Sequence, residues 1–213
     1  MGPGENLVAL LPGSRKPEIR VLGPRMAAAA KILSGRRPMK FVVPVPESLV
    51  RMAHACFPPP IKIIVERAAD ALLACDAAVV KTGSATLEAA VAGAPQVTVY
   101  DFGWAGRIEW IFLWMWKRIP FIAMPNIILQ RVLVPELLGP KCTPEGIAAA
   151  VGKLLQSDED RRSMKEGYCE IRRHLGGDLP LGATERTVEI LEEMLGMSAA
   201  ADHPQNAKHA SRP

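Results

Sequence analysis

Short apolar runs without polar alternation recur along the first hundred residues of the chain. They predict strands at residues 7–11, 41–43, 61–65, 77–80 and 96–100, with a further strand near 121–124. Several of these runs are rich in valine and isoleucine. A strand that is apolar on both faces is typical of a parallel sheet covered by helices.

Helical periodicity fills the segments between these runs. Helices are expected over residues 17–34, 67–74, 84–92, 143–156, 158–174 and 183–195. Alternating strands and helices predict an α/β fold with a Rossmann-like, doubly wound parallel sheet. The segment from Met197 has no period, so we expect a folded domain over residues 1–196 and a disordered tail over 197–213.

Composition narrows the class of protein. Hydrophobic residues make up 49% of the 213, which excludes wholesale disorder. A net charge of +4 is compatible with phosphates or acidic lipids as partners, and we expect no nucleic-acid partner. The four cysteines have no C-x-x-C spacing, which fits a reducing cytoplasm and indicates neither a disulfide framework nor a metal site.

A glycine corner follows the first predicted strand. Gly13 lets the backbone approach a ligand, Ser14 can donate, and Arg15 can pair with a phosphate through two parallel hydrogen bonds. Ligands of parallel sheets bind beyond the carboxyl ends of the strands, where this corner lies. The alternative is an ordinary turn followed by a solvated arginine.

A second candidate site lies where the strand at 77–80 gives way to a helix. The small residues here leave backbone N–H groups exposed at a helix start, which suits an anion; they are Thr82, Gly83, Ser84, Ala85 and Thr86. Glu88 can accept from the hydroxyls of a ribose. The alternative is a capped helix whose early carboxylate complements the helix dipole.

Polar residues also interrupt the apolar stretch at 124–148. Asn126, Gln130 and Arg131 are candidate ligand contacts. A loop amide that satisfies local backbone is the alternative, and spacing does not decide between them.

All four tryptophans fall within residues 104–118, in a chain with only 5% aromatic residues. The run is too short to cross a bilayer. Tryptophan beside basic residues suits a membrane surface, and the expected contacts are Trp104, Trp110, Trp114, Trp116, Lys117 and Arg118. The alternative is a helix buried at a domain or subunit contact.

Taken in order, these stretches resemble the carboxyl-terminal half of the lipid-A-disaccharide synthase family, inverting glycosyltransferases of the two-domain GT-B type. The resemblance runs from about residue 7 to 195. It is carried by LVALLPGSR at 7–15 with Glu18, DAAVVKTGSATLE at 76–88, Pro95, Tyr100, Pro125-Asn126, Arg131, VPELL at 134–138 and CTPE at 142–145.

The resemblance implies a reaction and a set of roles. UDP-2,3-diacylglucosamine donates its sugar to 2,3-diacylglucosamine 1-phosphate, and UDP leaves. The corner at 13–15 faces the diphosphate, with Arg15 stabilising the leaving group; residues 82–86 take phosphate or ribose, Glu88 takes the ribose, and Asn126, Gln130 and Arg131 lie near the nucleotide. No metal or other cofactor is implied, so cationic side chains and helix dipoles must stabilise the departing UDP. The acylated substrates imply a cytoplasmic protein bound to the inner face of the membrane.

Two departures from the family pattern stand out. Leu129-Gln130 replace the small Ala-Gly pair that the family has before Arg131. The chain also begins just before the donor domain, so we expect the amino-terminal acceptor domain to be absent or separate, and no general base is identified. The alternatives are another GT-B enzyme of UDP-sugars, such as a peptidoglycan N-acetylglucosaminyl transferase or an epimerase, and a nucleotide-binding module without catalysis.

Overall fold

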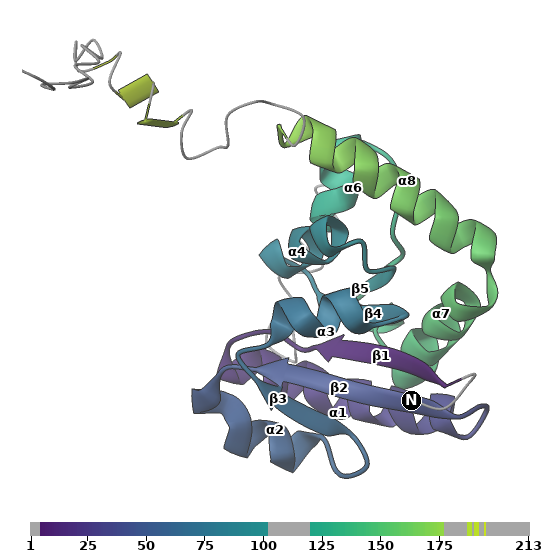
Figure 1. Ribbon diagram of the computed structural model, residues 1–213. Helices are drawn as coiled ribbons and strands as arrows, with labels where there is room; N and C mark the ends of the chain where they lie inside the picture. The colour runs from purple at the N-terminus through teal and green to yellow at the C-terminus, as the bar shows by residue number, and fades with distance from the viewer. Residues whose placement is uncertain (1–4, 102–119, 177–186, 189, 192–193, 195–213) are drawn as a thin grey trace, which may run out of the picture. The chain divides into compact units, whose positions relative to one another are not determined.

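A six-stranded parallel sheet forms the centre of the unit Met1–Arg172 in the computed structural model (Figure 1). Residues 5–101 and 120–176 are described, together with 187, 188, 190, 191 and 194. The strands are β1 (Asn6–Leu11), β2 (Met39–Val45), β3 (Lys62–Val65), β4 (Ala77–Lys81), β5 (Gln96–Tyr100) and β6 (Glu136–Leu138). Their order is β3-β2-β1-β4-β5-β6, which confirms the predicted doubly wound α/β sheet.

The direction of winding reverses between β1 and β4. These two strands are neighbours in the sheet, with Val8 opposite Ala77 and Leu11 opposite Val80. Segments about 70 residues apart in sequence therefore end side by side at the carboxyl edge.

Helices connect the strands at nearly the predicted positions. They are α1 (Lys16–Ser34), α2 (Val50–Cys56), α3 (Ala68–Ala74), α4 (Ser84–Ala92), α6 (Met124–Leu129), α7 (Pro144–Gln156) and α8 (Asp158–His174), with short 3-10 turns at Glu47–Leu49 and Gly139–Lys141. The sequence did not predict α2 or α6. The helix expected over 183–195 lies largely outside the described residues.

The core has two layers, one on each face of the sheet. On β1, Val8 and Leu10 pack with α1 and α7, whereas Ala9 and Leu11 pack with α3 and α4. Figure 1 shows α1 and α2 on one side of the sheet and α3 on the other. Because residues 8–11 are all buried, the strand has no polar face, which explains its unbroken apolar run.

The strand predicted near residues 121–124 is wrong. Residues 120–123 are irregular, α6 begins at Met124, and the sixth strand is β6. The backbone N–H groups of Ile122 and Ala123 donate to Glu136 Oε1, at 3.1 and 2.9 Å, instead of to a neighbouring strand. One carboxylate therefore takes the place of a strand ladder.

Two predictions fall outside the described residues. The tryptophan segment, with Lys117 and Arg118, lies there, and so does the tail at 197–213. Both remain predictions, as does a domain boundary at residue 196. None of the described helices combines the length and the apolar character needed to cross a membrane.

Candidate functional site at the carboxyl edge of the sheet

A pocket of about 520 Å³ opens where β1, β2 and β4 end. It lies at the point where the winding reverses, the place at which open α/β sheets bind ligands. The predicted residues that line it are Gly13, Ser14, Arg15, Thr82, Gly83, Ser84, Ala85 and Glu88. Two sequence stretches predicted to bind one ligand thus meet in one pocket.

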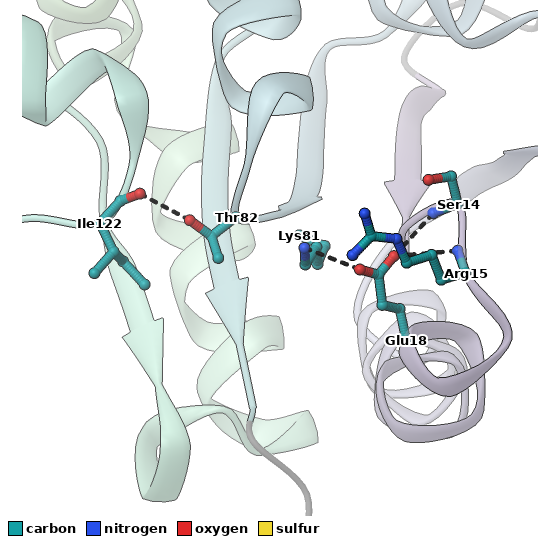
Figure 2. Close-up of polar contacts among 6 residues, drawn as sticks. All are labelled: Ser14, Arg15, Glu18, Lys81, Thr82 and Ile122. Atoms are coloured by element: carbon teal, nitrogen blue, oxygen red, sulfur yellow. Dashed lines mark hydrogen bonds and ion pairs between the residues drawn. The ribbon is translucent and has the colours of Figure 1, made fainter. Parts of the chain in front are cut away.

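The loop between β1 and α1 is built around the carboxylate of Glu18. Glu18 Oε2 accepts from the backbone N–H of Ser14 at 3.0 Å and of Arg15 at 3.2 Å (Figure 2). Gly13 has a φ of 113°, and a Cβ at this position would lie 2.1 Å from Glu18 Oε2. Only glycine fits both the backbone conformation and the seat of the carboxylate.

Lys81 is a pocket cation that sequence reasoning missed. Its Nζ lies 3.0 Å from Glu18 Oε1 and 5.8 Å from the centre of the Tyr100 ring. Figure 2 shows the side chain of Lys81, at the end of its strand, facing that of Glu18. A basic residue that ends a buried strand directly before a glycine turn was the available signal.

The pocket carries charges of both signs. Arg15 and Lys81 are its cations near β1 and β4, and among the described residues no ion pair involves the Arg15 guanidinium. Arg67, on the β3 side, pairs with Asp70 through Nε at 2.6 Å. Glu66 also lines this side with a φ of 53°, an uncommon backbone conformation for a residue other than glycine.

The start of α4 presents backbone donors to the pocket. Gly83 precedes the helix with a φ of 135°, and it has no side chain to cap the helix. Over residues 5–101 and 120–176, no hydrogen bond occupies the N–H of Ser84 or Ala85. Such a helix start favours an anion.

The two threonines of this segment have different surroundings. Thr82 lines the pocket, and its hydroxyl donates to the Ile122 carbonyl at 2.8 Å (Figure 2). Thr86 is fully buried and does not line the pocket. Its hydroxyl donates to the Gly83 carbonyl at 2.7 Å and accepts from the Met124 N–H at 3.2 Å. Thr86 therefore fixes the helix start from beneath.

The third predicted stretch does not line this pocket. Asn126 is fully buried; its Nδ2 donates to the Val134 carbonyl and to Glu136 Oε1, both at 2.9 Å. Its Oδ1 accepts from the N–H groups of Leu133 and Val134, at 2.8 and 2.9 Å. Asn126 thus joins α6 to the segment that leads into β6.

Gln130 and Arg131 are exposed beyond the end of α6. Gln130 has a φ of 51°, and its side chain donates to the Ile127 carbonyl at 2.6 Å. Arg131 pairs with Glu170 on α8, with Nη2 2.6 Å from Oε2. In the part of the chain that the structure describes, no group of three or more His, Cys, Asp or Glu side chains has the arrangement of a metal site.

Several proteins of known structure share this fold. The spinosyn rhamnosyltransferase SpnG complexed with thymidine diphosphate is 14% identical, with a TM-score of 0.59, over 89% of this chain and 45% of that one. The MnaA–UDP co-structure from S. aureus is 13% identical, with a TM-score of 0.59, over 91% of this chain and 46% of that one. The calicheamicin glycosyltransferase CalG4 is 20% identical, with a TM-score of 0.57, over 93% of this chain and 45% of that one. At these identities the likeness shows the fold alone: the chain has the fold of about half of each of these glycosyltransferases, in agreement with the predicted half of a GT-B fold.

Sequence relatives are more specific. The lipid-A-disaccharide synthase of Burkholderia vietnamiensis is 34% identical over 199 residues, which cover 89% of this chain and 50% of that protein. The lipid-A-disaccharide synthase of Myxococcus xanthus is 37% identical over 197 residues, which cover 88% and 49%. The chain therefore spans about half the length of the curated relatives it matches. Residues 1–186 match the family described as Lipid-A-disaccharide synthetase, and the chain belongs to that family.

Proposed function

We propose that this chain holds the sugar donor of a lipid A glycosyltransferase. In this proposal UDP-2,3-diacylglucosamine binds in the pocket between the ends of β1 and β4. Its diacylglucosamine passes to 2,3-diacylglucosamine 1-phosphate, and UDP is released. The observation that carries the proposal is the convergence of Arg15, Lys81 and the start of α4 on one pocket, in a chain of this family.

The pocket residues divide the nucleotide between them. The N–H groups of Ser84 and Ala85 suit one phosphate, because an uncapped helix start carries partial positive charge. Arg15 and Lys81 suit the diphosphate, and Glu88, exposed on α4, can accept from the ribose hydroxyls. The UDP and thymidine diphosphate named for two proteins of similar fold belong to the same ligand class.

Arg15 has the part closest to the chemistry. When the bond between the sugar and UDP breaks, negative charge grows on the departing diphosphate. A fixed cation at that position stabilises the transition state more than the ground state, which is how such a group accelerates transfer. We assign neither the binding of the acceptor nor the role of general base to a residue of this chain.

Asn126, Gln130 and Arg131 are not among the lining residues of this pocket, and we do not include them in the proposed donor contacts, because their side chains bind Val134, Ile127 and Glu170. Acylated substrates would place the reaction at the cytoplasmic face of a membrane. We propose the tryptophan segment at 104–118 for that contact, on sequence grounds. The family match favours this donor over a peptidoglycan-type sugar or an epimerase reaction.

Calorimetric titration of the purified chain with UDP tests the proposal. Arg15→Ala and Glu88→Gln are each expected to weaken binding about ten- to a hundredfold, since a hydrogen bond to a charged group contributes about 1.5–3 kcal/mol. Arg162→Ala and Glu166→Gln, exposed on α8, are the matched controls and should bind like the parent. Equal affinity in all four variants would show that Arg15 and Glu88 do not contact the nucleotide.

A further inference from the structure

We infer that Glu18 is a positioning residue of the donor site, which fixes the loop after β1 and holds Lys81 toward the ligand. The inference rests on the proposed function, because the ligand in question is the diphosphate of the same nucleotide sugar. It explains why a negatively charged carboxylate lies inside a pocket that is proposed to bind an anion.

The Glu18 carboxylate uses both of its oxygens. Oε2 accepts from the N–H groups of Ser14 and Arg15, while Oε1 lies 3.0 Å from Lys81 Nζ. The side chains of Glu18 and Lys81 are only 18% and 22% exposed. Shielding from water makes such a pair stronger than one on the open surface. One carboxylate thereby links the end of β1 to the end of β4.

Gly13 makes room for this link. A Cβ on Gly13 would lie 2.1 Å from Glu18 Oε2 and 2.9 Å from Glu18 Cβ. The carboxylate is therefore seated against the backbone of the loop, and its seat exists only because residue 13 is glycine.

The arrangement also divides the donors of the pocket. Because Glu18 occupies the N–H groups of Ser14 and Arg15, those groups hold the loop instead of a phosphate. The backbone donors left for the ligand are at the start of α4, at Ser84 and Ala85. The β1 side then contributes the guanidinium of Arg15, whose backbone is fixed by Glu18, and the β4 side contributes Lys81.

The sign of one measurement separates positioning from simple charge. Removing a carboxylate from the pocket would by itself strengthen the binding of an anion, because a like charge disappears. Weaker binding after Glu18→Gln can therefore come only from lost positioning. Glu18→Asp keeps the charge but is shorter by one methylene group, so it cannot reach the loop and Lys81 together.

The test is calorimetric titration of the full chain with UDP and, separately, with inorganic pyrophosphate. Glu18→Gln and Glu18→Asp should each weaken UDP binding about tenfold, or about 1.4 kcal/mol. Pyrophosphate binding should fall in the same proportion, because the lost contacts concern the phosphates. Asp160→Asn is the control; it removes a carboxylate paired with Lys153 at 3.5 Å on the surface, and it should bind like the parent.

Variants of Lys81 provide a second, independent test of the inference. Lys81→Gln should weaken binding, Lys81→Arg should restore most of it, and adding Glu18→Gln to Lys81→Gln should weaken binding by less than the two single losses combined. If Glu18→Gln does not fold, the UDP affinities of Glu18→Asp, Lys81→Gln and Lys81→Arg still test the positioning role of Glu18.

Glu18 variants that bind UDP as tightly as the parent, or more tightly, overturn the inference and leave the proposed function standing. Full additivity of Glu18→Gln and Lys81→Gln, or a Lys81→Arg variant no better than Lys81→Gln, also overturns it. A parent chain that binds no UDP at millimolar concentration refutes the proposed function, and the inference fails with it.

Discussion

Replacing Asn126 with alanine is expected to lower the free energy of unfolding by about 3–5 kcal/mol while leaving the donor pocket intact. The side chain is fully buried and uses its whole hydrogen-bonding capacity, two donors and two acceptors. Alanine would leave the N–H groups of Leu133 and Val134 and the Val134 carbonyl without this partner. Each buried polar group left unsatisfied costs about 1–3 kcal/mol, and water entering the vacated space recovers part of the sum.

This loss would be a large share of the stability of a typical domain, about 5–15 kcal/mol. Urea unfolding followed by circular dichroism measures it directly, and with a slope of about 2 kcal/mol per molar urea the midpoint should fall by about 2 M. Gln130→Ala is the matched control, because it also removes an amide but only one exposed local hydrogen bond. Its expected effect is under about 1 kcal/mol.

The result that would refute this reasoning is a small change for Asn126→Ala, under about 1 kcal/mol, accompanied by lost UDP affinity in the folded protein. Asn126 would then act on the nucleotide, as the sequence alone had suggested, and its four hydrogen bonds in this structure would not be its main role.

Three further predictions concern the loop, the thiols and the membrane segment. Gly13→Ala should lower the free energy of unfolding by about 2 kcal/mol or more, because φ is 113° and Glu18 fills the space, whereas Gly35→Ala at φ −71° should be nearly neutral; equal effects in urea titrations would contradict this. Burial raises the pKa of Cys75 from 9.0 to about 11, so between these pH values the folded chain keeps a proton that the unfolded chain loses. The free energy of unfolding should therefore fall as the pH rises from about 9 toward 11. If Cys75→Ala leaves this dependence of stability on pH unchanged, the prediction is contradicted. Trp110→Ser combined with Trp114→Ser should reduce sedimentation with anionic vesicles at unchanged UDP affinity, and undiminished sedimentation would favour the protein-contact alternative.

The apolar pattern predicted the strands that are buried on both faces. The run at 96–100 coincides with β5, and the run at 7–11 misses only the first residue of β1. Packing on both sides leaves such strands no polar positions, so the local sequence carries the whole signal. β6 has three residues, all partly exposed, and begins at Glu136. No apolar run marks it, because its place depends on pairing with β5.

In the candidate site, too, some features could be predicted from the sequence and others could not. The carboxyl ends of parallel strands meet at one edge, so the turns at 13–15 and 82–85 could be assigned to one pocket from sequence. The contact between Glu18 and Lys81 could not, since it requires β4 to lie directly beside β1. Asn126 is a similar case: its partners, Leu133, Val134 and Glu136, are near in sequence, but Glu136 lies on β6, which pairs with the distant β5.

The central claim is that a nucleoside diphosphate binds between the ends of β1 and β4. Titrating UDP into the ¹⁵N-labelled chain while following its backbone amide resonances tests this most directly. The account predicts the largest shifts at Ser84 and Ala85, with smaller shifts at Ser14 and Arg15, whose N–H groups already bind Glu18. Leu133 and Val134, held by Asn126, should not move. Shifts centred on Leu133 and Val134, or none at millimolar UDP, would contradict the account.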